Sequence, residues 1–447
     1  MIGRFALSRF VLSQGWRDLL EYSAWALAGL WMWRTREAIR RLPGVPDLNT
    51  NKWDLVPPPE APWLTVVVPA RNEAENLGAS LEALLAQEYE HLWVLAVDDR
   101  STDGTGKIVD EYVARQPDRV GAIHVDYLPE GWLGKTFALE VGVRNSASEY
   151  LLFTDADVLF SPSSLRRAMA CAAMTKADHL VVYPTPLVKG RGEGIVLGFF
   201  QVLGLWAARP WKVPDPRARR DVVGIGAFNL VRREALEVLG GWEPQRLAVL
   251  EDVTLGRRMK AAGMRQVVAF GPDLVLVHWA TGARGLVRVM TKNLFSGVNF
   301  RPALLLGGVA VVFGLFLLPL AGLVLQATVV PSLLILCCIG ACYRLMGGWS
   351  LIDARYGWLY PLGALAMIWA MLRSMLSAMV RRGVMWRGTF YPLRELREHN
   401  SPFVWERAAA KARRMEAKGE KRVGNRLLAV WPALRERKKT NDVQTKG

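Results

Sequence analysis

Two aspartates stand two residues apart in Asp155-Ala156-Asp157, directly after the apolar run Tyr150–Phe153. At the end of a buried strand two neighbouring carboxylates repel each other, and a divalent cation is the simplest partner that keeps both ionised. Hard cations such as Mg²⁺ take oxygen ligands, so this pair suits them. Because the Asp-x-Asp pattern is short, a solvated turn is the alternative interpretation, and the surrounding motifs must decide between the two.

Three more polar motifs lie where an apolar run gives way to a helical pattern. They are Pro69-Ala70-Arg71-Asn72-Glu73, Asp98-Asp99 with Asp103, and Gly131-Trp132-Leu133-Gly134-Lys135. A helix start offers backbone N–H groups to an anion, and Arg71 and Lys135 add positive charge. One acid of the second motif suits a hydrogen bond from a base or ribose, whereas Asp103 suits a helix cap. A plain turn and a surface lysine are the alternatives for the other two motifs.

A second acidic pair, Glu251-Asp252, precedes the amphipathic stretch Val253–Ala262. A carboxylate within reach of a hydroxyl group can take its proton, so the pair predicts a general base, with a helix cap as the alternative. His278 ends the apolar stretch Leu274–Val277. It is either a further metal ligand or a structural histidine with satisfied hydrogen bonds.

Strand and helix patterns alternate from Leu64 to about His278, and these elements must position the motifs. Apolar strands are predicted at Leu64–Val68, Leu92–Val97, Ala122–Val125 and Tyr150–Thr154, and amphipathic helices at Glu73–Gln87 and Thr105–Gln116. This alternation predicts an α/β domain whose mostly parallel sheet is covered on both faces. Ligands of such sheets bind at the carboxyl ends of the strands, which is where the motifs lie.

The order of the motifs resembles the inverting family 2 glycosyltransferases, which have a GT-A fold with a Rossmann-like, mostly parallel mixed sheet. The resemblance covers about residues 63–280 and includes Gly240-Gly241-Trp242 before the second acidic pair. Leu128–Lys135 and the apolar flanks are most similar to membrane enzymes that glycosylate apolar lipids, such as hydroxychlorobactene glucosyltransferases and hopanoid-associated glycosyltransferases. The resemblance implies a nucleotide-sugar donor such as a UDP-hexose, a lipid hydroxyl as acceptor, and Mg²⁺ or Mn²⁺.

It also implies a role for each matching residue. The donor is bound by Pro69, Arg71 and Glu73 on the uridine side, by Asp98 and Asp99 at the nucleoside, and by Lys135, Asp155 and Arg288 at the diphosphate. The metal ion is held by Asp155 and Asp157. Asp252 is the general base and Glu251 supports it, while Gly226, Ala227 and Phe228 shape the acceptor site.

One departure from the family concerns the Gln/Arg-x-x-Arg-Trp motif of processive and ceramide-type relatives. The corresponding region here reads Arg288-Val289-Met290-Thr291-Lys292-Asn293 and has no Trp. Arg288 or Lys292 can still serve the diphosphate, but the missing motif argues against a processive polymerase.

Composition places this domain at a membrane. Hydrophobic residues make up 51% of the 447, Trp is frequent at 18, and the net charge is +16. Ala303–Gln326 is 24 residues without a charge, Val329–Tyr343 is apolar, and Trp358–Val380 is apolar apart from Arg373. Leu19–Trp33 is short for a span and predicts either a tilted transmembrane helix or an interfacial one. Gly194–Trp206 is either an interfacial helix near the acceptor or a buried core helix.

The expected organisation has five parts. They are a membrane helix with a basic flank (1–41), a linker (42–62), the glycosyltransferase domain (63–300), two to four transmembrane helices (301–382) and a basic tail (383–447). Residues 381–447 hold 18 Lys and Arg against 7 Asp and Glu, or +11 net. No nucleic-acid-binding module is recognised, so no nucleic-acid partner is expected.

Nucleotide sugars are cytosolic, so we expect the domain on the cytosolic side of a bacterial-type inner membrane. Three later spans would then put the basic tail outside, against the positive-inside tendency. Two full spans with Val329–Ile352 re-entrant or broken, or a fourth crossing, would resolve this. The sequence thus predicts a non-processive, metal-assisted membrane glycosyltransferase. A polysaccharide- or polyprenyl-phosphate-directed transferase and a non-catalytic membrane scaffold are the alternatives.

Overall fold

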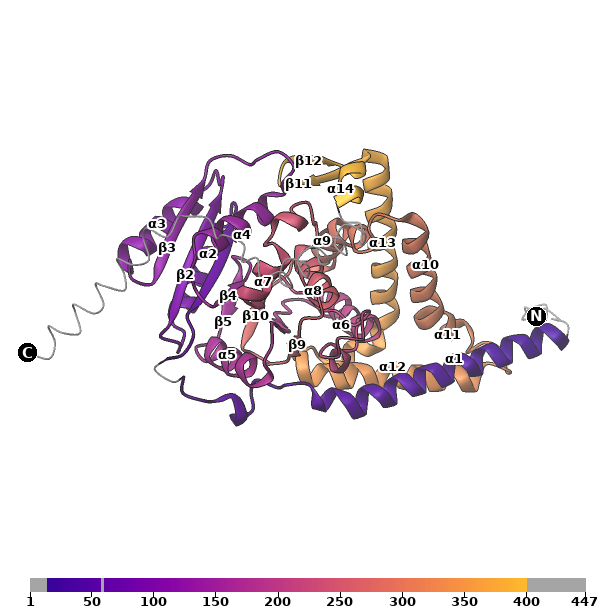
Figure 1. Cartoon of the computed structure of the whole chain (residues 1–447). Helices are drawn as coiled ribbons and strands as arrows, with labels where there is room; N and C mark the ends of the chain where they lie inside the picture. The colour runs from indigo at the N-terminus through magenta and orange to yellow at the C-terminus, as the bar shows by residue number, and fades with distance from the viewer. Residues whose placement is uncertain (1–13, 58–59, 400–447) are drawn as a thin grey trace, which may run out of the picture.

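The computed structural model describes residues 14–57 and 60–399. Its centre is a seven-stranded sheet with the order β3-β2-β1-β4-β8-β6-β9 (Figure 1). The strands are β1 (Leu64–Ala70), β2 (Leu92–Asp99), β3 (Val120–Val125), β4 (Tyr150–Phe153), β6 (His179–Val182), β8 (Asn229–Arg232) and β9 (Gln266–Ala269). The first four are mutually parallel and β8 is antiparallel to both of its neighbours, which confirms the predicted mixed α/β sheet.

Alternate side chains of β1 point to opposite faces of the sheet, and every residue of the strand is buried. Val66 and Val68 pack against Leu81 and Val109 on one face, whereas Val67 packs against Leu139 on the other. The first face is covered by α2 (Leu77–Leu85), α3 (Thr105–Arg115) and α5 (Ser164–Thr175). The second face is covered by α4 (Gly134–Arg144), α7 (Arg233–Leu239) and α8 (Glu251–Ala261). A strand buried on both faces explains the continuous apolar run in its sequence.

A three-stranded sheet, in the order β5-β10-β7, extends the domain beyond β4. Its strands are β5 (Val158–Phe160), β7 (Thr185–Pro186) and β10 (Val275–Val277). The domain continues into α6 (Arg191–Ala207) and α9 (Gly282–Gly297), which pack against each other. The alternative of a buried core helix holds for α6, because Val196, Phe199 and Val202 are buried beneath later helices.

Four long apolar stretches surround α6 and α9. They are α1 (Gln14–Arg41), α10 (Pro302–Val312) with a π-helical turn (Phe313–Leu317) and α11 (Leu318–Ala321), α12 (Val329–Ser350), and α13 (Tyr360–Arg381). Within the described residues, three helical segments are long and apolar enough to cross a membrane: Pro302–Ala321, Val329–Ser350 and Ala354–Arg381. The helix α1 is not one of these three, but it lies beside α12, and its Trp31 donates a hydrogen bond to the Leu315 carbonyl (3.2 Å; Figure 1).

After α13 the chain returns to the sheet domain. A hairpin of β11 (Gly383–Trp386) and β12 (Thr389–Pro392) is followed by α14 (Leu393–His399), and Leu396 is fully buried. The expected basic tail therefore begins as a folded segment packed on the domain. The remainder of that tail, residues 400–447, lies outside the described residues, as do residues 1–13 of the expected N-terminal part.

Candidate active site

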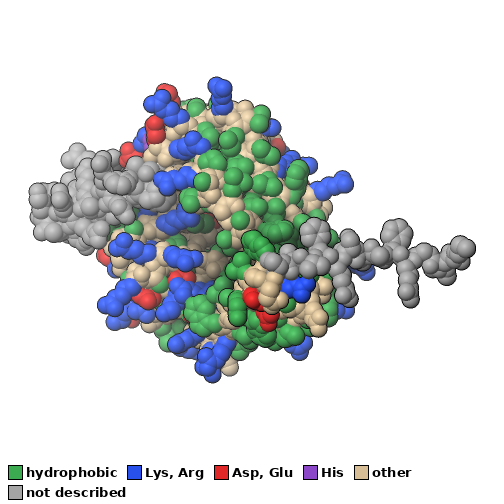
Figure 2. All heavy atoms as spheres, turned by 90° about the vertical axis from the view of Figure 1, so that its right-hand side faces the viewer, with side chains coloured by type: hydrophobic (Ala, Val, Ile, Leu, Met, Phe, Trp, Pro, Cys, Tyr) green, Lys and Arg blue, Asp and Glu red, His purple; other side chains and the backbone are tan. Residues whose placement is uncertain are grey.

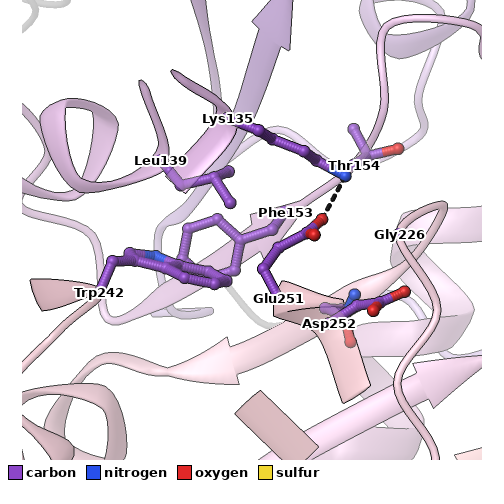
Figure 3. A pocket seen from close by; sticks show the side chains of 9 residues that line it. Lys135, Leu139, Phe153, Thr154, Gly226, Trp242, Glu251 and Asp252 are labelled. Atoms are coloured by element: carbon purple, nitrogen blue, oxygen red, sulfur yellow. Dashed lines mark ion pairs between the residues drawn. The ribbon is translucent and has the colours of Figure 1, made fainter. Parts of the chain in front are cut away.

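The carboxyl ends of β1, β2 and β4 meet at one edge of the sheet. The strand register pairs Ala70 with Asp98 and Val67 with Phe153, so the chain leaves all three strands at neighbouring points. The first residues of α4 and α8 reach the same edge. Together these elements surround a pocket lined by Lys135, Leu139, Phe153, Thr154, Gly226, Asn229, Trp242, Glu251 and Asp252 (Figure 3).

Lys135 joins the two acidic motifs in this pocket. Its Nζ lies 2.5 Å from Asp155 Oδ1 and forms a second ion pair with Glu251 Oε1 (Figure 3). Burial alone would lower the pKa of Lys135, but the nearby carboxylates of Asp155, Glu251 and Asp252 raise it above its ordinary value. The lysine is therefore a fixed positive charge at the point where the two acidic motifs converge.

Asp252 is the half-buried acid of the second pair. Burial raises its pKa first and the neighbouring Glu251 carboxylate raises it further, to about 7, while the Lys135 ammonium group opposes the rise. A carboxylate with a pKa near neutrality is suited to accept a proton in a reaction. The loop before β8 approaches the start of α8 closely, because a methyl group on Gly224 would lie 2.1 Å from the Asp252 carbonyl oxygen.

The electrostatics of Asp155 and Asp157 suit a divalent cation. Burial raises the pKa of Asp157, and the neighbouring Asp155 carboxylate raises it further. Burial also raises the pKa of Glu73, and the carboxylates of Asp157 and Asp155 add to this rise. Their mutual repulsion and their oxygen ligands fit Mg²⁺ or Mn²⁺. No three His, Cys, Asp or Glu side chains in the described chain are grouped to hold a metal by themselves. Mg²⁺ is commonly bound by one or two carboxylates, and phosphate oxygens of the substrate complete its coordination shell.

His278 directly follows Val277, which pairs with Val158 across β10 and β5, so the strand register places His278 near Asp157. His278 Nε2 is 3.6 Å from Glu193 Oε2, and Glu193 also accepts hydrogen bonds from the N–H groups of Lys189 (2.7 Å) and Gly282 (2.7 Å). The Glu193 side chain thus lies between β10 and α6. His278 Nε2 is buried and makes no hydrogen bond to the described residues, so the expected histidine with satisfied hydrogen bonds is not what the structure shows.

Around Arg71 the structure corrects one expectation. The chain does not enter a helix there, because Asn72 has φ 55° and α2 begins only at Leu77. The N–H groups that were expected to face an anion instead donate to side chains of the next loop: Asn72 to Ser101 Oγ (3.0 Å), Glu73 to Thr105 Oγ1 (2.8 Å) and Ala74 to Asp103 Oδ2 (3.2 Å). A guanidinium group, rather than a helix start, is what this motif presents.

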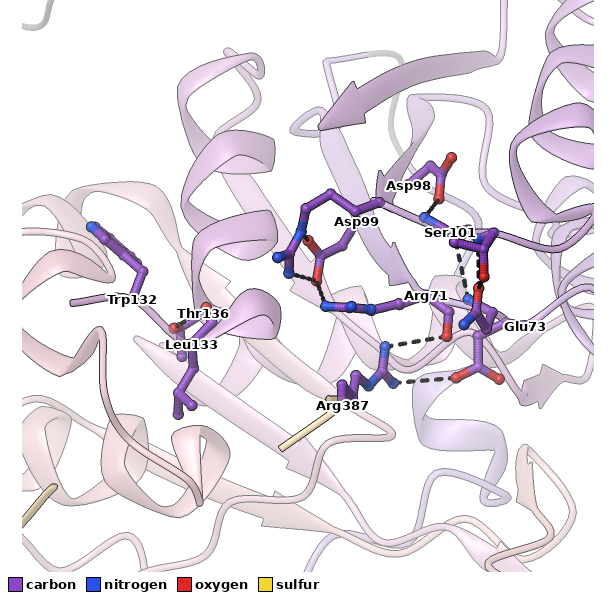
Figure 4. Close-up of polar contacts among 12 residues, drawn as sticks. Arg71, Glu73, Asp98, Asp99, Ser101, Trp132, Leu133, Thr136 and Arg387 are labelled. Carbon is purple, nitrogen blue, oxygen red and sulfur yellow. Dashed lines mark hydrogen bonds and ion pairs between the residues drawn. The ribbon is translucent and has the colours of Figure 1, made fainter. Parts of the chain in front are cut away.

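Asp98 and Asp99 point to opposite sides of β2, as consecutive strand residues must. Asp99 is paired with Arg100 (2.7 Å) and lies 3.8 Å from Arg71 (Figure 4). Asp98 lies on the other side, where its Oδ2 is 3.3 Å from His124 Nδ1. Of the two, only Asp99 is next to the start of α4, since a methyl group on Gly134 would lie 2.3 Å from its Oδ2.

Gly226 lies in the pocket rather than at its margin. A methyl group built on it would be 2.5 Å from Asp155 Oδ2 and 3.3 Å from Lys135 Nζ. Ala227 is buried and its carbonyl accepts a hydrogen bond from Thr154 Oγ1 (2.8 Å). Phe228 is fully buried in the core beside Phe160, so its side chain cannot shape an acceptor site as expected.

Arg288 is exposed on α9 and forms no ion pair with any residue in the described ranges. Sequence reasoning missed Asn229, which lines the pocket, and the role of Trp242. Trp242 is buried against Phe153 (ring centroids 4.9 Å apart), and its backbone N–H donates to Glu140 Oε2 (2.9 Å). The Gly-Gly-Trp motif was the available signal for Trp242, whereas nothing marked Asn229.

The sequence model of Glycosyl transferase family 2 matches residues 65–240. This stretch is a family 2 glycosyltransferase domain. The match includes Arg71, Asp99, Lys135 and Asp155, whereas Glu251-Asp252 and all of the apolar helices except α6 lie outside it.

Two related proteins from Staphylococcus aureus are named 4,4'-diaponeurosporenoate glycosyltransferase. The protein of strain bovine RF122 / ET3-1 is 25% identical over 242 residues, and that of strain USA300 is 25% identical over 239 residues. Each match covers 53% of this chain and 62% of the relative, so it spans less than two thirds of the relative's own length. These matches confirm the resemblance to family 2.

Among solved structures, the mannosyltransferase PcManGT from Pyrobaculum calidifontis, in complex with GDP-Man and Mn²⁺, is similar with a TM-score of 0.50. The sequences are 19% identical, and the match covers 82% of this chain and 98% of that one. At this identity the likeness concerns the fold, and it agrees with the predicted GT-A class of the family 2 domain.

Proposed function

We propose that the chain is a membrane glycosyltransferase that moves a sugar from a nucleotide sugar to a lipid hydroxyl group with inversion. The observation that carries the proposal is the double ion pair of Lys135. It brings Asp155, at the diphosphate end of the motif series, next to the pocket that Glu251 and Asp252 line. A donor-binding group and a group able to accept a proton are thus adjacent. The names of the relatives from Staphylococcus aureus support an apolar lipid as the acceptor.

The donor side of the pocket is assigned to Arg71, Asp99 and Lys135. A UDP-hexose is the first donor to test, with the nucleoside beside Asp99 and the diphosphate beside Lys135. Asp155 and Asp157 would hold Mg²⁺ or Mn²⁺, and the ion bound there supplies positive charge against the negative charge of the leaving diphosphate. Lys135 adds a second positive charge at the same place and forms an ion pair with Glu251.

Asp252 is assigned as the general base. Its carboxylate takes the proton of the acceptor hydroxyl as that oxygen forms a bond to the anomeric carbon. The bond between this carbon and the diphosphate oxygen breaks at the same time, and its electron pair leaves with the nucleoside diphosphate. Attack from the side opposite the leaving group inverts the anomeric centre.

We assign the binding of the lipid acceptor to the apolar side of the molecule, which faces the viewer in Figure 2. Hydrophobic side chains gather there, and Lys and Arg side chains lie around its edge. The segments from α10 to α13 carry many large exposed apolar side chains, among them Leu304, Leu306, Val311, Phe313, Leu333, Leu362, Leu365, Trp369 and Leu376. A wide apolar surface with basic residues at its edge suits a bilayer with anionic headgroups.

We assign α13 a position at the membrane, with one side packed along the surface of the domain. Its buried residues Gly363, Met367 and Ser374 recur at helical spacing, and Ser374 Oγ accepts a hydrogen bond from Phe295 N–H of α9 (3.0 Å). Both of its ends meet the domain. Before it, the Tyr356 ring packs on Gly194, and after it, the β11–β12 hairpin contacts the loop before α4. Because this helix of 22 residues, about 33 Å long, contacts α6 and α9 along its course, we assign it to the membrane interface and not to a crossing.

The two segments before α13 are then assigned as those that enter the bilayer. Pro302–Ala321 starts beside α13 and Val329–Ser350 runs beside α1, and the two segments meet where α11 contacts α12 (Figure 1). This arrangement keeps the expected number of two crossings but differs from the expectation in which Val329–Ile352 is re-entrant or broken, because the second crossing is Val329–Ser350 instead of the segment that contains α13. It leaves the end of the described chain, at His399, on the side of the family 2 domain, in keeping with the positive charge of the tail.

The proposal is tested with the purified full-length protein in detergent. A panel of UDP-hexoses and GDP-mannose is incubated with a lipid extract, and products are identified by mass spectrometry. Asp252→Asn is expected to lower kcat by about 10²–10⁴-fold with donor binding unchanged. Full turnover in that variant, or no sugar transferred to any lipid by the unaltered protein, would refute the assignment.

A further inference from the structure

We propose that Arg387, in the turn of the β11–β12 hairpin, is a donor-binding residue that contacts the anionic diphosphate of the nucleotide sugar. The inference rests on the proposed function and adds a residue from outside the family 2 domain to its site. It follows from the position of the hairpin, from the backbone conformation of its turn and from the charges around the guanidinium group.

The hairpin places Arg387 at the edge where β1 ends. Its Nη2 lies 3.2 Å from Glu73 Oε1, and its Nη1 lies 3.5 Å from the Arg71 carbonyl oxygen (Figure 4). The Arg387 side chain as a whole is 35% exposed.

The turn itself disfavours arginine. Arg387 has φ 46° and Gly388 has φ 84°, and two-residue hairpin loops with positive φ at both positions strongly prefer Asn-Gly or Asp-Gly. A non-glycine residue in the left-handed region carries a conformational cost that is commonly found at functional sites. Arginine at this position is therefore explained better by its guanidinium group than by the needs of the turn.

The hairpin is held firmly enough to present one side chain. Tyr391 is buried, and its hydroxyl donates to the Trp132 carbonyl (3.0 Å) in the loop directly before Lys135. In the helix that follows, Arg397 donates to the Phe300 carbonyl (2.8 Å). Tyr391 and Leu396 also share a core with Leu133 and Leu247. The hairpin turn and Lys135 are thus fixed relative to each other.

The surrounding charges indicate an anion as the ligand. Arg71 and Arg100 share the buried Asp99 carboxylate, so that acid already has cationic partners. Arg387 contacts Glu73, whose pKa is raised by burial and by Asp157 although Arg387 opposes this. A planar guanidinium group with free N–H groups binds phosphate through paired hydrogen bonds. A purely structural bond from Arg387 to Glu73 is the competing explanation.

The experiment measures binding of UDP and GDP, and of uridine and guanosine, to the full-length protein by calorimetry with MgCl₂ present. Arg387→Asn removes the guanidinium group and installs a residue that the turn favours, so the hairpin is retained. Arg387→Lys keeps the positive charge. Arg394→Asn is the matched control, because Arg394 is 91% exposed on α14 and pairs with Glu398.

Arg387→Asn is expected to weaken nucleoside diphosphate binding by about 10- to 100-fold, the range of a lost charged hydrogen bond. Nucleoside binding and the thermal unfolding midpoint should stay unchanged, Arg387→Lys should bind with intermediate affinity, and Arg394→Asn should match the unaltered protein. Equal diphosphate affinity in Arg387→Asn would overturn the inference while leaving the proposed function intact. Failure of the unaltered protein to bind either diphosphate would overturn both.

Discussion

At the residue scale, the site places the negative charges of several carboxylates around the positive charge of Lys135. Lys135 pairs with Asp155 and Glu251, and Asp252 next to them has a pKa raised to about 7. Glu251 forms an ion pair with Lys135, whereas Asp252 is the acid whose pKa lies near neutral pH. Two neighbouring acids with different environments can thus have different roles.

This difference predicts the pH dependence of transfer. A general base must be deprotonated to accept a proton, and the pKa of Asp252 is raised, so the active form is lost as pH falls through about 7. The value of kcat/KM is expected to fall roughly tenfold per pH unit below that point. Initial rates measured across the pH range at low donor concentration check this. A flat profile in the unaltered protein, or the same slope in Asp252→Asn, would contradict the assignment.

Gly226 gives a second prediction at this scale. In Gly226→Ala the added methyl group would lie 2.5 Å from Asp155 Oδ2, so the carboxylate must move away from Lys135 and from its metal-binding position. We expect a raised KM for the donor and a raised requirement for Mg²⁺ or Mn²⁺. Gly204→Ala in α6 is the control, because a methyl group there meets nothing within 4 Å. Kinetics with donor and metal titrations compare the two, and equal parameters would count against the role of Asp155.

At the element scale, the sequence predicted the strands better than the ends of the helices. Apolar runs marked β1, β2 and β4 because these strands are buried on both faces. The helix expected from Glu73 begins at Leu77 instead, because Asn72 adopts a left-handed conformation and the next loop takes the N–H groups. A pattern of side-chain polarity does not reveal a bond between two loops, so the turn was invisible in the sequence.

The hairpin was missed for a similar reason. Gly383–Pro392 follows the apolar α13, and its basic residues suggested a tail. What fixes it to the domain is a set of contacts with residues far away in the sequence, such as the bond from Tyr391 to Trp132. Phe228 shows the opposite error, since its position in the motif series suggested a ligand contact, but its side chain fills the core.

The packing of α13 on α6 gives a prediction at this scale. A methyl group on Gly363 would lie 2.5 Å from Phe199 Cβ and 2.8 Å from the Ile195 carbonyl oxygen. Gly363→Leu should therefore separate the two helices and cost about 1–3 kcal/mol. Gly307→Leu in α10 is the control, because its methyl group meets nothing within 4 Å. Thermal unfolding in detergent is expected to show a lower midpoint for the first variant only, and equal midpoints would speak against this packing.

At the scale of the whole molecule, one long apolar segment is both a candidate span and a part of the domain surface. Ala354–Arg381 has the length and composition of a transmembrane helix. It nevertheless contacts α6 and α9 along its course, while its other side exposes Leu362, Leu365 and Trp369. An interfacial helix explains both observations, because one side packs on protein and the other meets acyl chains. Length and hydropathy alone do not separate this case from a span.

Labelling of cysteines at the two ends of α13 decides between the two. Arg355 precedes the helix and Arg394 follows it, and their side chains are 88% and 91% exposed. With Cys171, Cys337, Cys338 and Cys342 replaced by alanine, Arg355→Cys and Arg394→Cys are treated with a membrane-impermeant maleimide in sealed vesicles of each orientation. If α13 lies along the domain, both positions react from the face that carries the family 2 domain. If it spans the bilayer, they react from opposite faces. Reaction from opposite faces would also return the basic tail to the side that the positive-inside tendency disfavours, so the lipid-facing arrangement of the whole enzyme depends on this one measurement.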